Sequence, residues 1–408
     1  MPIDSNKVEY LCHNGVPFEK MKNVKPLRPF ADEVISFLSA LSQELFRNKT
    51  SKVYPEIVTF AFYCRKANLE NERKKYLDCM ENHIGRGLTF HIAPSNVPIN
   101  FAYSMVAGLL SGNACIVRVS SKPFPQTDII CNAMNSVLSS DEHSKMKEFI
   151  SVIRYERDTE VTSYLSALCN VRIIWGGDET INGIRKSPIS PRAYDITFAD
   201  RYSVCVIKAK EYLVQSNYQK TADAFYNDTY LFDQNACSSP HLIVWVGTDD
   251  DIEKAKDIFW DTLYSCVKQN YKVEAATAVD KLMTFCRCAI DIGPVKRERM
   301  NDNLVSRISV SRLTSDIHEY RCPGGCFIEY SDVNLDSLAG IVNEKYQTMT
   351  YIGFEPEELK NWVMANGLKG IDRIVPVGKS SDFSLIWDGY DLIRNLSRVC
   401  YSVQGKPI

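Results

Sequence analysis

The chain has 408 residues, and a prior of roughly 150 residues per domain predicts two or three domains. Hydrophobic residues account for 45% of the sequence and charged residues for 24%, as in water-soluble globular proteins. Because 48 Lys and Arg residues oppose 50 Asp and Glu residues, the net charge of -2 argues against nucleic acid or an acidic membrane as a partner. A local nucleotide site is still compatible with this balance.

The location of the protein is predicted from its termini, apolar runs and cysteines. The first residues contain no apolar run typical of a secretory signal, and Gly, Ser and Asn residues interrupt the longest apolar stretch, 101–117. We therefore expect a cytoplasmic protein without a membrane span. The 14 cysteines are then expected to be reduced thiols. The close pairs Cys286/Cys288 and Cys322/Cys326 lack the repeated C-x2-C spacing of a zinc site, so no metal is expected.

The first half of the chain predicts helices followed by a parallel sheet. Apolar residues recur at helical spacing over residues 30–80. From residue 88, strands and helices are then expected in alternation, which is typical of a parallel α/β sheet. The expected strands are 88–92, 115–119, 151–155 and 171–175, and the expected helices are 101–110, 124–138 and 161–168.

The first predicted strand ends in Pro94-Ser95-Asn96-Val97-Pro98. Two prolines fix the backbone around Asn96, and rigid placement is what an oxyanion donor needs. By itself, an Asn that closes a turn is the commoner use of the residue.

Gly176 and Gly177 follow the strand predicted over 171–175 and open a helix. Such a turn lets backbone N–H groups and the helix N-terminus face a phosphate. The sequence does not match G-x-G-x-x-G, and a tight β-α turn is the alternative interpretation.

A second alternation begins near residue 203 and predicts another α/β domain. Its strands are expected at 204–209, 242–246 and 326–330, and its helices at 219–226, 252–270 and 278–286. At the end of the chain, residues 398–403 alternate like a strand after a helix.

Cys237 lies in the second domain, among small polar residues and amides, just before the strand predicted over 242–246. A cysteine that only packs usually has apolar neighbours. A loop that enters a buried strand is instead a suitable position for a nucleophile. One cysteine among 14 is weak support by itself.

Several stretches together resemble the aldehyde dehydrogenase superfamily, and more specifically the LuxC-type acyl-CoA and acyl-protein reductases. Pro94-x-Asn96-x-Pro98, Gly112-Asn113, Gly176-Gly177 and Cys237 occur in the order of the superfamily's motifs. The resemblance runs from about residue 85 to the end. The matching stretches are 91–98, 175–180, 198–203, 227–240, 345–348, 370–378 and 387–391.

The resemblance implies a role for each motif residue. Cys237 would be the nucleophile that takes an acyl group, and Asn96 would donate to the oxyanion together with the backbone N–H of Cys237. Ordinary aldehyde dehydrogenases carry a hydrolytic glutamate where this chain has Phe198-Ala199-Asp200-Arg201. The missing base favours reduction of a thioester over oxidation of an aldehyde, although Asp200 could substitute for it. His91 and His241 flank the motifs, but histidines at strand edges are more often packed than catalytic.

The resemblance also implies a nucleotide cofactor. The superfamily's Lys-Pro-Ser-Glu motif contacts the adenosine ribose, and here Arg118 replaces the lysine while Ser121, followed by Lys122, replaces the glutamate. Two cations without the acid suit a 2′-phosphate, so NADPH is expected rather than NADH. The expected cofactor-binding residues are Arg118, Ser120, Ser121, Lys122, Gly176 and Gly177.

We therefore predict an aldehyde dehydrogenase-like α/β fold. N-terminal helices and a Rossmann-type cofactor domain would occupy 1–203, a second α/β catalytic domain 204–382, and a C-terminal helix with an oligomerisation strand 383–408. The expected function is NADPH-dependent reduction of long-chain fatty acyl thioesters, acyl-CoA or acyl-protein, to fatty aldehydes through an acyl-cysteine. An acyl-protein synthetase partner and a homo-oligomer are expected. The rival interpretations are an NAD(P)-dependent aldehyde dehydrogenase and a non-catalytic scaffold that binds acyl chains or the synthetase.

Overall fold

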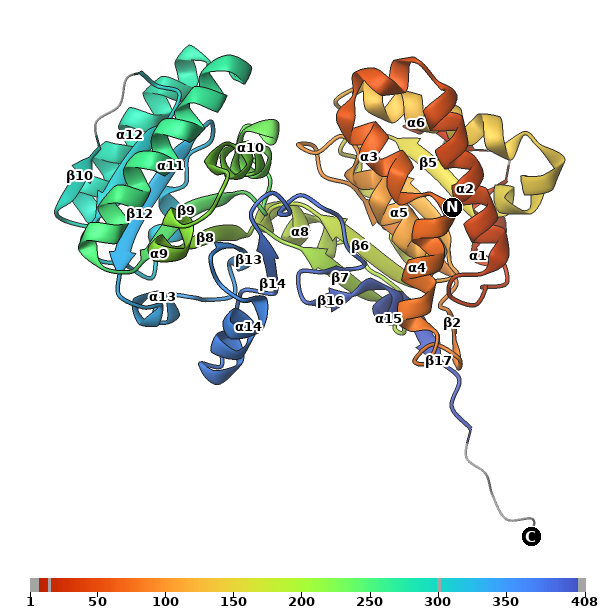
Figure 1. Cartoon of the computed structure of the whole chain (residues 1–408). Helices are drawn as coiled ribbons and strands as arrows, with labels where there is room; N and C mark the ends of the chain where they lie inside the picture. The colour runs from red at the N-terminus through yellow and green to blue at the C-terminus, as the bar shows by residue number, and fades with distance from the viewer. Residues whose placement is uncertain (1–6, 14–15, 299–301, 403–408) are drawn as a thin grey trace, which may run out of the picture. The chain divides into compact units, whose positions relative to one another are not determined.

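Two sheets organise the chain in this computed structural model, which describes residues 7–13, 16–298 and 302–402 (Figure 1). The first unit comprises the residues up to Ala199 together with those from Tyr390 onward, and the second runs from Asp200 to Gly389. The division therefore falls slightly before the boundary expected after residue 203. It does so because the whole of β8 (Tyr202–Lys208) pairs within the second sheet.

The sheet of the first unit has the strand order β1-β5-β4-β3-β6-β7. Neighbours from β5 to β7 are parallel, whereas β1, which the sequence did not predict, pairs antiparallel with β5. The order from β5 to β7 is that of a dinucleotide-binding sheet, whose order reverses between β3 and β6. The strands are β1 (Glu9–His13), β3 (Leu88–Ile92), β4 (Ala114–Arg118), β5 (Ile150–Arg154), β6 (Val171–Trp175) and β7 (Tyr194–Phe198).

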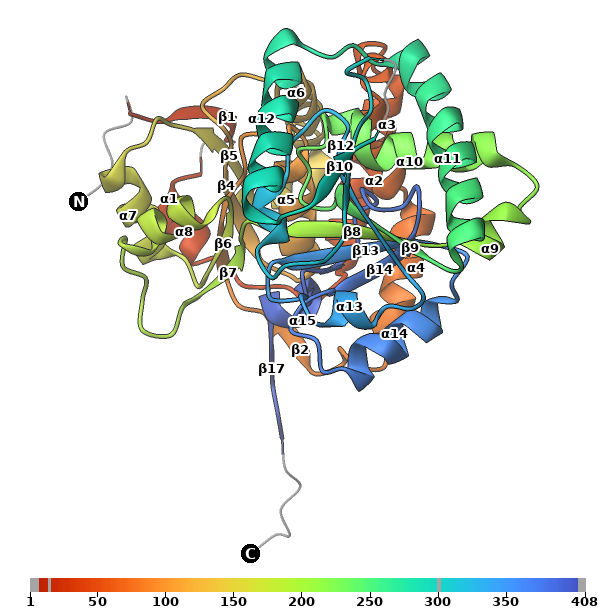
Figure 2. The same cartoon turned by 90° about the vertical axis from the view of Figure 1, so that its left-hand side faces the viewer.

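Helices cover both faces of this sheet. In Figure 2, α7 and α8 lie on one side of its strands, and α5 and α6 lie on the other. The predicted alternation of parallel strands and helices is thereby confirmed. The helices are α1 (Phe18–Lys22), α2 (Asp32–Arg47), α3 (Pro55–Tyr63), α4 (Lys66–Tyr76), α5 (Asn100–Leu110), α6 (Pro125–Leu138), α7 (Thr159–Leu168) and α8 (Asp178–Arg185).

The Gly112-Asn113 turn joins α5 to β4. Gly112 has a φ of 86°, and a Cβ there would lie 2.0 Å from the carbonyl oxygen of Leu27, so only glycine fits. The Asn113 side chain accepts from the backbone N–H of Gly87 at 3.0 Å and donates to the carbonyl of Leu396 at 2.8 Å. One amide thus ties the start of β3 and the C-terminal region to this turn.

The C-terminal residues return to the first unit. After α15 (Leu392–Leu396), the short strand β17 (Ser397–Val399) pairs antiparallel with β2 (His83–Gly85). A strand is therefore present near the predicted position, but it pairs within its own chain. The last residue of the predicted 398–403 strand lies outside the described residues, and its role in joining subunits stays a prediction.

The second unit has the strand order β10-β11-β12-β9-β8-β13-β14, parallel from β11 to β14. The strands are β8 (Tyr202–Lys208), β9 (Pro240–Val246), β10 (Val295–Arg297), β11 (Ser306–Val310), β12 (Cys326–Asp332), β13 (Tyr346–Ile352) and β14 (Arg373–Pro376). The helices are α9 (Ala209–Leu213), α10 (Tyr218–Thr229), α11 (Asp249–Asn270), α12 (Ala275–Asp291), α13 (Asp336–Ala339) and α14 (Pro356–Ala365). A small hairpin of β15 (Ile386–Trp387) and β16 (Tyr390–Asp391) follows.

Alternate residues of these strands build two cores. Val204 and Val206 face one core with Cys288 of α12, whereas Cys205 and Ile207 face another with Phe259 of α11. Figure 2 shows α11 and α12 on opposite sides of the strands. Within the part of the chain that the structure describes, no helix has both the length and the apolar character needed to cross a membrane.

Candidate active site

Cys237 lies on the segment between the short helical turn η4 (Tyr230–Phe232) and β9. Every residue of β9 is buried, so the predicted loop entering a buried strand is confirmed. Cys237 itself keeps partial exposure. A buried strand thus holds one end of the segment that presents the thiol.

Gln234 fixes the other end of this segment. It is buried, has a φ of 61°, and follows Asp233, whose φ is 51°. Its side-chain oxygen accepts from the backbone N–H groups of Gly325 and Cys326 at 2.9 and 3.0 Å. Its side-chain nitrogen donates to the carbonyls of Cys326 and Pro240 at 3.1 and 2.9 Å. A fully bonded buried amide therefore locks a left-handed turn just before the cysteine.

Polar groups from neighbouring strands meet Cys237. Ser203 donates its hydroxyl hydrogen to the carbonyl of Cys237 at 2.7 Å and accepts from the Thr348 N–H at 3.2 Å. The side-chain nitrogen of Gln347, on β13, lies 3.2 Å from the Cys237 sulfur. The same nitrogen also donates to the carboxylate of Asp388. The backbone carbonyl and the thiol of Cys237 are therefore both held by polar contacts from neighbouring strands.

The surroundings of the thiol favour its neutral form. Burial raises the pKa of Cys237 to about 11, and the charge of Asp388 adds to the rise. The hydrogen bond from Gln347 and the charge of Arg201 act in the opposite direction on this pKa. Attack on a carbonyl needs the thiolate, so groups that stabilise the anion at this sulfur matter for reactivity.

Asp388 is the carboxylate that the tertiary structure brings into this environment. Burial raises its pKa to about 6, while Arg201 and Gln347 oppose the rise. The Arg201 guanidinium lies 3.9 Å from Asp388 and also pairs with Asp372. Sequence reasoning did not select Arg201, Gln347 or Asp388, although the stretches 198–203, 345–348 and 387–391 that carry them matched the family resemblance.

The residues at the place of the hydrolytic glutamate have other contacts. Phe198 stacks on Trp175 with ring centroids 3.6 Å apart. Both carboxylate oxygens of Asp200 accept from Arg321 at 2.7 Å. Asp200, which the sequence left open as a substitute base, is thus tied to a guanidinium.

Asn96 lies between β3 and α5 and is exposed. It belongs to the first unit, whereas Cys237 belongs to the second.

The other predicted site residues of the first unit gather at one edge of its sheet. Arg118 ends β4, and Gly176 follows β6 directly. Because β3 pairs in parallel with both strands, the carboxyl ends of all three lie side by side, and the Asn96 segment leaves from the middle one. This edge is where open α/β sheets bind nucleotides.

The residues after β4 form a polar, cationic group. The Arg118 guanidinium donates to the carbonyl of Tyr155 at 3.1 Å and to the Ser121 hydroxyl at 3.4 Å. Its buried Nε has no hydrogen-bond partner among the described residues. Ser120 accepts from the N–H of Lys122, whose side chain is exposed. The Arg118 guanidinium, which has one N–H unpartnered within the described ranges, and the exposed ammonium of Lys122 together suit a phosphate.

The Gly176-Gly177 turn is less suited to an anion. A Cβ at Gly177 would meet nothing within 4 Å, so the turn is open on that side. However, Asp178 and Glu179 stand in the first turn of α8, and their charges oppose a phosphate at this helix end. These glycines would therefore contact a cofactor by letting the backbone approach it closely.

Both flanking histidines are buried and neutral. Burial lowers the pKa of His91 and of His241 to about 3. The ring nitrogens of His91 bond to the hydroxyls of Ser104 and Thr89 at 2.7 and 2.9 Å. These are the contacts of packed residues. Across the described ranges, no group of three or more His, Cys, Asp or Glu side chains could hold a metal ion.

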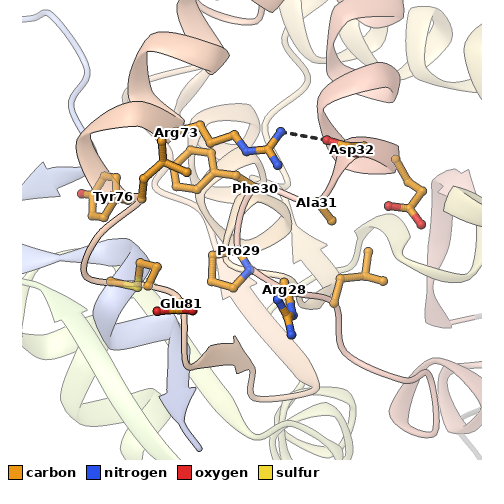
Figure 3. A pocket seen from close by; sticks show the side chains of 12 residues that line it. Arg28, Pro29, Phe30, Ala31, Asp32, Arg73, Tyr76 and Glu81 are labelled. Atoms are coloured by element: carbon orange, nitrogen blue, oxygen red, sulfur yellow. Dashed lines mark hydrogen bonds and ion pairs between the residues drawn. The ribbon is translucent and has the colours of Figure 1, made fainter.

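A surface pocket of about 490 Å³ lies in the first unit, between the segment before α2 and the end of α4 (Figure 3). Figure 3 shows the ion pair between Arg73 and Asp32 at its rim. Its lining includes none of the predicted site residues. The candidate site is therefore defined by the contacts of Cys237 and not by this pocket.

The fold is that of aldehyde dehydrogenases, as the sequence predicted. 1-Pyrroline-5-carboxylate dehydrogenase from Thermus with bound NAD superposes with a TM-score of 0.61 at 12% identity, over 93% of this chain and 82% of that one. Lactaldehyde dehydrogenase from Escherichia coli superposes with a TM-score of 0.61 at 10% identity, over 94% and 87% of the two chains.

Within this fold class, residues 24–265 match the model of the acyl-CoA reductase (LuxC) family, and the chain belongs to that family. It is 27% identical over 331 residues to the long-chain acyl-protein thioester reductase of Vibrio harveyi, covering 79% of this chain and 65% of the relative. It is 24% identical over 332 residues to the enzyme of the same name from Photorhabdus luminescens, covering 79% and 64%. The chain thus spans slightly less than two thirds of these relatives.

Proposed function

We propose that this protein reduces long-chain fatty acyl thioesters to fatty aldehydes, with Cys237 carrying the acyl group. The main support is the thiol itself, held on a rigid loop with an amide donor 3.2 Å from its sulfur. Family membership and the names of the relatives from Vibrio harveyi and Photorhabdus luminescens support the substrate class.

In the first step, the Cys237 sulfur attacks the thioester carbonyl of acyl-CoA or an acyl-protein. The thiol proton leaves, a C–S bond forms, and the carbonyl oxygen becomes an oxyanion. Collapse expels the donor's thiolate, which takes up a proton, and leaves a new thioester on Cys237. A thioester replaces a thioester, so the acyl group stays reactive on the enzyme.

Asn96 would donate a hydrogen bond to the oxyanion together with the backbone N–H of Cys237. Each preorganised donor of this kind contributes about 3 to 4 kcal/mol to the barrier reduction. The two prolines at 94 and 98 restrict the backbone on both sides of the amide.

NADPH would bind to the first unit, and when bound it would supply the hydride that reduces the acyl carbon. Arg118 and Lys122 would hold its 2′-phosphate, with Ser120 and Ser121 completing the group after β4. Gly176 and Gly177 would allow the backbone to approach the cofactor. The preference for NADPH rests on these cations and on the absence of an acid at the family's ribose position.

Product release then depends on Cys237. The thiohemiacetal on its sulfur collapses, the C–S bond breaks, and the aldehyde leaves as Cys237 departs as a thiolate. The Asn96 amide would hold the oxygen until this collapse, and the Gln347 N–H would stabilise the departing sulfur.

The acyl donor and the assembly belong to the same proposal. An acyl-protein synthetase that activates fatty acid with ATP would deliver the acyl group. The strand predicted over residues 398–403 would pair with the sheet of a neighbouring subunit, because an unpaired strand edge is a liability that such pairing removes.

The test is intact-protein mass spectrometry after mixing with a long-chain acyl-CoA. An adduct with the mass of one acyl group is expected on Cys237, and addition of NADPH should discharge it as fatty aldehyde. In Cys237→Ala, the rate of adduct formation should fall at least about a thousandfold. Cys286→Ala is the matched control, since Cys286 is an exposed thiol of the same unit. An adduct that survives Cys237→Ala unchanged would show that another residue carries the acyl group.

One observation favours a second candidate, the oxidation of aldehydes to acids. Asp388 places a carboxylate with a pKa of about 6 close to the thiol, where a hydrolytic base would be needed. Steady acid release from aldehyde and NADP+, independent of CoA and abolished by Asp388→Asn, would establish this activity. Aldehyde release from acyl-CoA and NADPH in the same variant would instead support the reductase.

A further inference from the structure

Within the second unit, a line of polar side chains extends from the Cys237 sulfur. The Gln347 amide nitrogen lies 3.2 Å from the sulfur and also donates to Asp388. Asp388 faces Arg201 at 3.9 Å, and Arg201 pairs with Asp372. Gln347 and Asp388 are 1% and 8% exposed, so water competes little for these contacts.

The carboxylate of Asp388 decides which end of the Gln347 amide faces the thiol. An ionised carboxylate only accepts hydrogen bonds, so the end that meets it must be the NH2 group. The second hydrogen of that group is then directed at the Cys237 sulfur. At the other end, the Gln347 carbonyl oxygen accepts from the Thr348 hydroxyl at 3.1 Å. Both ends of the amide are therefore fixed.

We propose that Gln347 and Asp388 are positioning residues that set the ionisation of Cys237: Gln347 stabilises the thiolate by a directed N–H, and Asp388 orients that amide while its charge opposes the thiolate. The importance of this control for turnover rests on the proposed reductase function. The effect of Gln347 and Asp388 on the ionisation of Cys237 is a property of the protein without acyl donor or NADPH.

The two residues act on the thiol with opposite sign. Loss of the Gln347 donor removes a hydrogen bond that favours the anion, so the thiol should ionise at higher pH. Replacing Asp388 by its isosteric amide removes a like charge but keeps an oxygen that can accept from Gln347. The thiol should then ionise at lower pH. A role in packing alone would move both variants in the same direction.

Other charges near Asp388 are common to all variants. Arg201 and Arg373 favour the ionised carboxylate, and Asp372 disfavours it. Arg201 also acts on the thiol directly. Because these groups stay in place, the difference between the Gln347 and Asp388 variants isolates the two residues.

The experiment measures alkylation of Cys237 by iodoacetamide between pH 6 and pH 9, read by mass spectrometry of the peptide that contains it. Gln347→Met keeps the length of the side chain and removes the donor, and Asp388→Asn removes the charge. A hydrogen bond to a charged group shifts a pKa by about one unit or more. A lower thiol pKa gives more thiolate at pH 8, but each thiolate is then a weaker nucleophile. Because the two effects partly cancel, we expect the alkylation rate at pH 8 to change about three- to tenfold.

The expected result is slower alkylation in Gln347→Met and faster alkylation in Asp388→Asn. Gln219→Met and Asp316→Asn, both exposed positions of the same unit, should leave the rate unchanged. The exposed thiols Cys79, Cys286 and Cys400 serve as references within each sample. Circular dichroism melting identifies a variant that fails to fold, and the conservative Asp388→Asn change then tests the charge by itself.

Equal rates in all variants would overturn the proposal, and so would a shift of the same sign in both. The assay needs neither acyl donor nor NADPH. A protein that shows the opposite shifts but forms no acyl adduct would therefore contradict the reductase function and not the control of the thiol.

Discussion

The side-chain nitrogen of Gln347 lies 3.2 Å from the sulfur of Cys237, although 110 positions separate the two residues in the sequence. Parallel pairing of β13 with β8, and of β8 with β9, brings the strand that carries Gln347 close to the loop that precedes β9 and carries Cys237. The candidate nucleophile is therefore a thiol with a directed donor, and not merely a cysteine on a loop.

Asn96→Ala should slow acyl transfer to Cys237 by about a hundredfold to a thousandfold, since loss of one oxyanion donor has that effect in other enzymes. The rate of adduct formation with a long-chain acyl-CoA measures it. Asn366→Ala removes an exposed amide at the end of α14 and should leave the rate unchanged. Equal rates in Asn96→Ala and the unmodified protein would remove Asn96 from the mechanism.

Lys122→Ala should weaken NADPH binding about tenfold and leave NADH binding nearly unchanged, because the ammonium would pair with the 2′-phosphate that NADH lacks. Lys122 is the informative position: Arg118 also bonds the Tyr155 carbonyl, so its replacement would disturb the loop. Fluorescence titration with each nucleotide gives the two dissociation constants. Lys66→Ala, at an exposed position of α4, is the control. Equal weakening of both nucleotides would argue against a 2′-phosphate contact.

Glu329→Leu should destabilise the second unit by about 3 to 5 kcal/mol, because it leaves a guanidinium and two indole N–H groups without their buried acceptor. The Glu329 carboxylate accepts from Trp245 and Trp260 at 2.9 Å each and from Arg307 at 2.7 Å. Urea unfolding followed by circular dichroism measures the loss. Glu357→Leu breaks an exposed pair with Lys360 and should change stability by less than about 1 kcal/mol. Similar midpoints for the two variants would contradict the prediction.

Asp388 should make the folded state less stable as pH rises from about 4 to about 6. Burial raises its pKa to about 6, above the value of about 4 in an unfolded chain, so the folded state holds a proton that the unfolded state has released. This contribution is fully present below pH 4 and is lost above pH 6.

Asp388→Asn removes the titration, so its unfolding free energy should fall by about 2 kcal/mol less across this interval than that of the unmodified protein. Urea midpoints at pH 4.5 and pH 7 give the comparison. Asp228, whose pKa burial also raises to about 6, is present in both proteins and cancels. Parallel pH dependences would mean that Asp388 titrates as it does in the unfolded chain.

Two strands of the first sheet were predicted with the bounds that the structure shows. The strands 88–92 and 171–175 are confirmed to the residue as β3 and β6, because central strands of a parallel sheet bury both faces. β13 was not predicted, and its sequence mixes Gln347 and Thr residues with apolar ones. The Gln347 and Thr side chains are buried, and the polar groups of Gln347 are satisfied by the Thr348 hydroxyl, by Asp388 and by the Cys237 sulfur.

The sequence by itself determined the family, the alternation of strands and helices, and Cys237 as the candidate nucleophile, since these depend on local order, periodicity and motif. Tertiary structure decided what surrounds the sulfur. Gln347, Asp388 and Arg201 come from separate segments, and their effect on the thiol depends on distances of a few ångströms at a buried point. Hydrogen bonds and charges act through space, so no pattern along the chain specifies which amide meets the thiol or which carboxylate orients that amide.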